Sequence, residues 1–136
     1  MDTYRSLLRQ SGLDPIDARL LLLHVLQRDH AWLISHRDDS ADSAHAAAFR
    51  QLQARRLAGE PVAYLLGERE FYSRMFRITP YVLIPRPDTE LIVTLALKRL
   101  KTLTWPRVLD LGTGSGAIAV SIACEHPEAA VIAVDV

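Results

Sequence analysis

Apolar residues in the first part of the chain recur every three or four positions, which is the spacing of amphipathic helices. A first short helix around Tyr4 is expected to stop at Ser11 and Gly12. A second helix is predicted from Pro15 to about Arg28, because Asp14 suits the position before a helix. Its predicted buried face consists of Ile16, Leu20, Leu23 and Leu26, widened by Leu21, Leu22 and Val25.

A third substantial helix is predicted from Ser43 to Ala58, with Gly59 as its stop. Before it, residues 31–34 are expected to form one short apolar turn, followed by a polar loop over residues 37–40. The predicted inward residues of the third helix are Phe49, Leu52 and Leu57, and its arginines Arg50, Arg55 and Arg56 are expected on a solvated face. Residues 1–66 are therefore predicted to form a small all-α N-terminal helical domain.

The pattern changes after Gly67. Two short β-prone runs, residues 69–72 and 75–79, are separated by Ser73 and Arg74 and predict a β-hairpin. Three prolines at positions 80, 85 and 87 exclude regular structure after the hairpin. Residues 67–87 as a whole are therefore predicted to be a β-hairpin linker. Asp88 is expected to cap a helix whose apolar residues are Leu91, Ile92, Leu95 and Leu100.

Residues 88–136 are predicted to begin an α/β domain. The stretch Val108–Leu111 has the composition of a buried strand, and three glycines at alternate positions follow it. An apolar helix is predicted from about Ser115 to Glu125, and a second strand from Ala130 to Val134 ends at Asp135. This β-α-β order predicts an open parallel sheet, and the glycines allow a ligand to approach the main chain between strand and helix.

Charge and composition narrow the class of protein. Sixteen basic residues balance sixteen acidic ones, so net charge gives no case for direct nucleic-acid binding. The single cysteine, Cys124, excludes an internal disulfide and is typical of a reducing compartment. No apolar run has the length of a membrane span, and the N-terminus lacks the order of a signal peptide. We therefore expect a cytoplasmic protein with no place in a membrane, and we predict no metal site.

What the glycine turn binds depends on Asp110. The spacing Gly112-x-Gly114-x-x-Ala117 also matches the fingerprint of dinucleotide-binding proteins, with Asp135 placed for a ribose. A carboxylate at Asp110 would repel the pyrophosphate of NAD or FAD, whereas S-adenosylmethionine has no phosphate and carries an ammonium and a sulfonium. Asp135 can accept hydrogen bonds from both ribose hydroxyls. The alternative interpretation is that Asp110 only caps the turn and Asp135 is a surface strand end.

Two groups of residues carry a family resemblance. Asp110-Leu-Gly-Thr-Gly-Ser-Gly-Ala117 resembles the first motif of class I S-adenosylmethionine-dependent methyltransferases. More specific is the combination of Gly59-Glu-Pro-Val-Ala-Tyr-Leu-Leu-Gly67, Arg69-Glu-Phe-Tyr72 and Leu83-Ile-Pro-Arg-Pro-Asp-Thr-Glu90. This combination is similar to the bacterial release factor glutamine methyltransferases, the PrmC/HemK family, and the resemblance covers the whole chain.

The resemblance implies methyl transfer from S-adenosylmethionine to the side-chain amide nitrogen of the glutamine in the Gly-Gly-Gln loop of peptide chain release factors. It implies a substrate-recognition role for residues 1–66 and a class I, Rossmann-like methyltransferase domain that starts in residues 88–136. It places the loop Pro85–Pro87 near the cofactor, with a plain rigid linker as the alternative. The implied cofactor-binding residues are Asp110, Gly112, Thr113, Gly114, Ser115, Gly116 and Asp135.

No catalytic residue is predicted in this chain. The family holds the amide with an Asn-Pro-Pro-Tyr motif, and this sequence has no asparagine and no Pro-Pro pair. We therefore expect the chain by itself to be inactive. Unless residues beyond Val136 complete the sheet, unpaired strand edges are expected to leave residues 108–136 disordered, aggregated or buried against another molecule. Two alternatives are a related enzyme that methylates a ribosomal-protein glutamine, and a partner-binding module without enzymatic activity.

Overall fold

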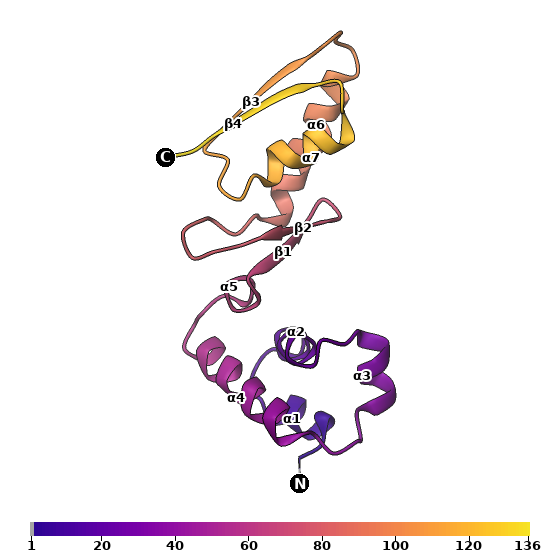
Figure 1. The fold of residues 1–136 in the computed structure, drawn as a ribbon, viewed down its shortest axis with the longest axis vertical. Coiled ribbons are helices and arrows are strands. Elements are labelled where there is room, and N and C mark those ends of the chain that lie inside the picture. The colour runs from indigo at the N-terminus through magenta and orange to yellow at the C-terminus, as the bar shows by residue number, and fades with distance from the viewer. Residues whose placement is uncertain (1) are drawn as a thin grey trace. The chain divides into compact units, whose positions relative to one another are not determined.

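The structure is a computed structural model that describes residues 2–136. These residues divide into two compact units, one ending at Leu66 and the other beginning at Gly67 (Figure 1). The first unit is entirely helical. Its helices are α1 (Tyr4–Arg9), α2 (Pro15–Leu26), α3 (His30–His36), α4 (Ser43–Leu57) and α5 (Val62–Leu66).

Side-chain caps fix where the first four helices begin. Each cap accepts hydrogen bonds from N–H groups of the new helix, which have no partner inside the helix itself. Asp14 accepts from the N–H of Ile16 at 2.8 Å, which confirms the predicted start of α2 at Pro15. Asp29 accepts from the N–H of Trp32 at 2.8 Å, so α3 runs for seven residues where a single apolar turn was predicted. The other two caps are Thr3 and Asp42.

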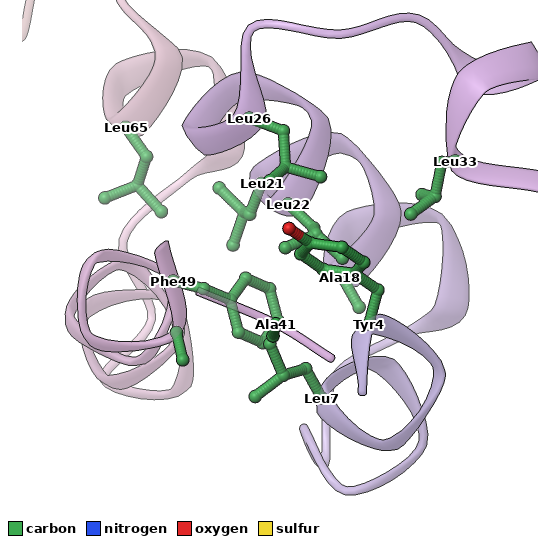
Figure 2. Packing of buried hydrophobic residues seen from close by; sticks show 11 residues of the cluster. Tyr4, Leu7, Ala18, Leu21, Leu22, Leu26, Leu33, Ala41, Phe49 and Leu65 are labelled. Carbon is green, nitrogen blue, oxygen red and sulfur yellow. The ribbon is translucent and has the colours of Figure 1, made fainter. Parts of the chain in front are cut away.

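The core of the helical unit is a cluster of side chains that converge from all five helices (Figure 2). Phe49 of α4 and Leu21 and Leu22 of α2 are completely buried in it. The predicted buried face of α2 is confirmed at Leu21, Leu22 and Leu26. It is wrong at Ile16 and Leu20, which are 58% and 39% exposed. The apolar stripe of α2 is wide, so periodicity alone could not select the side that packs against α1, α4 and α5.

Helix α4 confirms two of its three predicted core residues and corrects the third. Phe49 is buried and Leu52 packs against the core, whereas Leu57 is 58% exposed. The arginines of α4 lie on its surface, as predicted, but each forms an ion pair. Arg55 contacts Glu60 at 2.6 Å, Arg56 contacts Asp17 at 2.8 Å, and Arg50 contacts Asp2. Helix α5, which buries Ala63 and Leu65, was not predicted because it is only five residues long.

The second unit begins with the predicted hairpin. Strands β1 (Glu68–Phe71) and β2 (Arg74–Arg77) pair antiparallel, with Phe71 opposite Arg74. The two-residue loop is Tyr72-Ser73, one position earlier than predicted. Both loop residues have positive φ angles, 50° and 59°. Two-residue hairpins favour this conformation because its twist matches that of the strands.

A short 3-10 helix, η1 (Pro87–Thr89), leads into α6 (Glu90–Leu100). The predicted cap at Asp88 is wrong: Asp88 lies inside η1, and α6 begins at Glu90 without a side-chain cap. The 3-10 turn supplies the entry to α6 that a cap would otherwise supply. Of the predicted apolar residues only Leu100 is buried, whereas Leu91, Ile92 and Leu95 are exposed. The other buried residue of α6 is Val93, which was not predicted.

The unit ends with a β-α-β arrangement. Strands β3 (Arg107–Leu111) and β4 (Ala130–Val134) pair in parallel, and α7 (Ala117–Glu125) connects them and packs on both strands and on α6 (Figure 1). The disorder, aggregation or burial against another molecule expected for residues 108–136 stays a prediction. Alternate strand residues remain exposed: Leu109, Leu111, Ile132 and Val134. Among residues 2–136, no helix is long and apolar enough to cross a membrane.

Candidate functional site

The predicted site residues gather at the carboxyl ends of the two parallel strands. Asp110 lies opposite Ala133 and Leu111 lies opposite Val134 in the strand register, so the chain leaves both strands at the same edge. The glycine turn, residues 112–116, follows β3, and Asp135 follows β4. Ligands of open α/β sheets bind at this edge, where the loops that follow neighbouring strands meet.

The three glycines of the turn all have positive φ angles. The φ angles of Gly112, Gly114 and Gly116 are 72°, 56° and 80°, values that residues with a Cβ atom rarely adopt. A Cβ built at Gly112 or Gly114 would meet no heavy atom within 4 Å, so the space beside both residues is open. A ligand can therefore reach the main chain of the turn directly.

Main-chain hydrogen bonds fasten the turn to β4. The carbonyl oxygen of Val134 accepts from the N–H of Gly112 at 2.8 Å and from the N–H of Thr113 at 3.1 Å. Inside the turn, the N–H of Gly116 donates to the carbonyl oxygen of Thr113 at 2.9 Å. The shape of the turn is thus set by the pairing of the two strands.

Both candidate carboxylates bind the turn itself. Asp135 accepts from the N–H of Gly114 at 2.5 Å through one oxygen and from the N–H of Val136 at 2.8 Å through the other. Asp110 accepts from the hydroxyl of Thr113 at 2.8 Å. A carboxylate has about four acceptor sites, so each of these side chains keeps capacity for further donors. The carboxylates therefore cap the turn and retain further acceptor sites.

Helix α7 begins at Ala117 and not at Ser115, because Ser115 and Gly116 belong to the turn. Gly116 is the N-cap residue and offers no side-chain acceptor. No side chain therefore caps the N–H groups in the first turn of α7. The positive end of the helix dipole also lies at this N-terminus. The side chain of Ser115 is half-buried beside them.

These features fit S-adenosylmethionine. Its amino acid part combines an ammonium, a sulfonium and a carboxylate. Asp110 offers a negative group to the two cations, and the amides at the start of α7 are donors suited to the carboxylate. Asp135 offers acceptor oxygens suited to ribose hydroxyls. Within the described residues, no three side chains of His, Cys, Asp or Glu are grouped to hold a metal ion.

The predicted place of the loop Pro85–Pro87 near the cofactor stays a prediction. In the part of the chain that the structure describes, no hydrogen bond joins Pro85, Arg86 or Pro87 to the glycine turn; the carbonyl of Arg86 accepts from the N–H of Thr89 at 3.1 Å. One structural contact was missed: a side-chain oxygen of Glu90 accepts from the N–H of Tyr72 at 2.8 Å and ties the hairpin tip to α6. In the sequence, Glu90 stood out only as the last residue of a family motif. No periodicity of the chain indicates that it contacts Tyr72.

Known proteins resemble this chain over most of its length. Residues 1–67 match the family model described as the PrmC N-terminal domain. A release factor glutamine methyltransferase of Bordetella pertussis is 58% identical over 135 residues, which cover 99% of this chain and 50% of the relative. The protein of the same name from Burkholderia pseudomallei is 55% identical, with 98% of this chain and 47% of the relative covered. That from Vibrio cholerae is 46% identical, with 94% and 45% covered.

The chain thus spans about half the length of the curated relatives it matches. Both of its units are included in the aligned region, since the matches cover nearly all of its residues. The chain belongs to the family of release factor glutamine methyltransferases.

Proposed function

We propose that this chain supplies the cofactor turn and a substrate-recognition domain of an enzyme that methylates peptide chain release factors. The enzyme would transfer a methyl group from S-adenosylmethionine to the side-chain amide nitrogen of the glutamine in the Gly-Gly-Gln motif. The observation that carries the proposal is the open glycine turn with a carboxylate on each side, at the carboxyl ends of β3 and β4. The relatives are named release factor glutamine methyltransferases, and this supports the substrate.

The cofactor would bind the same residues that the sequence singled out: Asp110, Gly112, Thr113, Gly114, Ser115, Gly116 and Asp135. S-adenosylmethionine supplies an activated methyl group when bound. Asp110 favours this ligand over a dinucleotide, because its carboxylate would repel a pyrophosphate placed on the turn. In this proposal β3, α7 and β4 are the first part of a class I, Rossmann-like methyltransferase sheet. The substrate works in translation, so we place the reaction in the cytoplasm.

We propose no residue of this chain as the group that holds the glutamine side-chain amide of the substrate. An amide nitrogen is a poor nucleophile because its lone pair is delocalised into the carbonyl. An enzyme must therefore hold the amide so that its nitrogen is aligned with the methyl carbon and the sulfur. The family does so with Asn-Pro-Pro-Tyr, and the 136 residues contain no asparagine. The role of this chain is to bind cofactor and substrate.

The helical unit is proposed to recognise the protein substrate. A cleft of about 480 Å³ on this unit is lined by Leu8 and by three arginines, Arg5, Arg9 and Arg37. Asp38 contacts Arg5 at 2.7 Å and Arg37 at 3.5 Å, so a single carboxylate serves two of the three guanidinium groups. Arginine side chains on an apolar floor are common in protein interfaces. Deleting residues 1–66 should sharply slow methylation of the intact release factor, and an unchanged rate would contradict the recognition role.

The direct test is methyl transfer by a full-length chimera. In this chimera the chain replaces the 135 aligned residues of the Bordetella pertussis relative. We expect it to label a release factor with radioactive S-adenosylmethionine, and to leave unlabelled a release factor whose Gly-Gly-Gln glutamine is changed to alanine. The proposal is overturned if the unaltered relative is active and the chimera is folded but transfers nothing. Labelling of a ribosomal protein in place of the release factor would favour the alternative substrate.

A further inference from the structure

A cleft in the second unit lies away from the glycine turn and has no part in the function proposed above. Its volume is about 410 Å³, and Leu97 forms part of its lining. The cleft is near the C-terminal ends of α6 and α7, which pack side by side (Figure 1), whereas the glycine turn meets α7 at its N-terminal end. We call it the basic cleft and define it by six residues: Tyr72, Thr94, Lys98, Lys101, Glu125 and His126.

Positive charge in the basic cleft is not balanced by the protein. Lys98 and Lys101 are exposed, and within residues 2–136 neither has an ion-pair partner. The one carboxylate in the lining, Glu125, contacts the guanidinium of Arg74 at 2.7 Å. This hydrogen bond raises the pKa of Arg74, and the guanidinium lies against the Glu125 carboxylate. Two ammonium groups therefore remain free to attract an anionic ligand.

The hairpin tip forms a fixed wall of the basic cleft. Tyr72 has a φ angle of 50°, a conformation that costs about 1 kcal/mol or more for a residue with a large side chain. Three contacts hold it there: its N–H donates to Glu90 at 2.8 Å, its carbonyl accepts from Arg74 at 3.1 Å, and its hydroxyl lies 3.4 Å from that of Thr94. The Thr94 hydroxyl already donates to the carbonyl of Glu90, so the Tyr72 hydroxyl is the donor to Thr94. The hairpin turn and these contacts together fix Tyr72 as one wall of the basic cleft.

The composition of the basic cleft favours a protein ligand over a nucleic acid. A phosphate backbone requires a continuous run of cations, and the chain as a whole has no net charge. The lining instead mixes two ammonium groups with Leu97, an aromatic ring, a hydroxyl and a carboxylate. Such a mixture suits a peptide segment in which acidic side chains stand beside apolar ones.

We propose that the basic cleft docks an acidic segment of the protein substrate, in addition to the contacts of the helical unit. The identification of that substrate as a release factor rests on the proposed function. The two ammonium groups of Lys98 and Lys101 bind carboxylates of the segment, and Leu97 and Tyr72 contact its apolar side chains. Docking here fixes the substrate on the second unit at a place that the cofactor does not occupy.

Binding of the 136-residue chain to a release factor tests the proposal without any need for catalysis. Fluorescence titration should show that Lys98→Glu with Lys101→Glu weakens binding about tenfold, since two attractions become repulsions. The effect should shrink at high salt, because the side chains are exposed. Lys98→Gln with Lys101→Gln should weaken binding less, and this milder pair guards against a loss of fold. Arg99→Glu is the matched control, an exposed cation on the same helix outside the cleft, and should change affinity less than twofold.

Each other outcome overturns the inference. Equal affinities of the wild-type chain and the two lysine variants would contradict docking at the basic cleft, as would a wild-type chain that does not bind the release factor. Binding of an RNA duplex that is lost in the lysine variants, with release factor binding intact, would assign the cleft to nucleic acid instead. The proposed function fails separately, if the release factor binds with the expected lysine dependence and the full-length chimera transfers no methyl group.

Discussion

At the scale of single residues, Asp135 has two tasks in one side chain. Its carboxylate closes the glycine turn through Gly114, and it is the acceptor proposed for the ribose of the cofactor. The two tasks are compatible because each carboxylate oxygen accepts more than one hydrogen bond. Replacing this residue therefore alters both the ligand contacts and the shape of the turn.

Asp135→Ala in the full-length chimera should weaken binding of S-adenosylmethionine by about 1–3 kcal/mol, the usual loss when buried or ligand-bound polar groups lose their partner. Isothermal titration calorimetry measures this directly. Asp135→Asn keeps one acceptor oxygen and should lose less. Unchanged cofactor affinity in Asp135→Ala would remove this residue from the site.

Glu60 is a residue whose contribution to stability should depend on pH. The hydrogen bond from Arg55 holds the pKa of Glu60 below 4.5, the ordinary value for a glutamate. A lowered folded-state pKa stabilises the fold above pH 4.5, and this contribution is lost as the pH falls through the folded-state pKa. Because the pair is exposed, solvent and salt keep the effect small.

Glu60→Gln should therefore lower the thermal midpoint slightly at pH 7, and the difference from the wild type should disappear near the acid end of the titration. Differential scanning calorimetry at several pH values checks this. Glu128→Gln, an exposed glutamate with no ion pair in the part of the chain that the structure describes, is the control. A pH-independent difference for Glu60→Gln would contradict the assignment.

At the scale of elements, α2 illustrates what periodicity can and cannot establish. Its start followed from Asp14 and Pro15, since a cap is a local interaction between neighbouring residues, whereas its end at Leu26 lies two residues before the predicted one. Its buried side followed only in part, because the apolar stripe is so wide that several helical faces satisfy it. Packing against other helices selects Ala18, Leu21, Leu22 and Leu26, and packing is not a local property.

Leu21→Ala should destabilise the helical unit by about 2–5 kcal/mol, since it leaves a cavity in a completely buried position. Ile16→Ala, a truncation of similar size on the same helix, should cost about 0.5 kcal/mol or less because this side chain is mostly exposed. Urea unfolding followed by circular dichroism compares the two variants. Equal losses would support the face predicted from the spacing.

The candidate site shows the same division between local and distant information. The glycines and the two aspartates could be named from the motif, since chemistry and chain order define it. Their hydrogen bonds could not, because Gly114 meets Asp135 only through the register of β3 and β4. The hairpin tip and Glu90 are a second example, since their contact joins residues 18 positions apart.

At the scale of the whole molecule, the 136-residue chain by itself should transfer no methyl group. The sequence contains no asparagine to hold the amide, and the open space beside Gly112 and Gly114 leaves the turn without further walls. The exposed Leu109, Leu111, Ile132 and Val134 leave one set of strand side chains uncovered, so cofactor affinity should also be low. A single-turnover assay with labelled S-adenosylmethionine and a release factor checks this. Measurable transfer to the glutamine would contradict the prediction.

The link between the glycine turn and β4 has a consequence for synthesis of the protein. Asp135 follows Gly114 by 21 residues, and Val134, which holds Gly112 and Thr113, comes just before it. On a translating ribosome the glycines therefore emerge before the groups that give the turn its shape, and their amides bond to water in the meantime. The helical unit has its caps and core within residues 3–65, so it can fold while the remainder is still being made. A nascent chain should acquire its helical surface first and its cofactor turn only when β4 has left the ribosome.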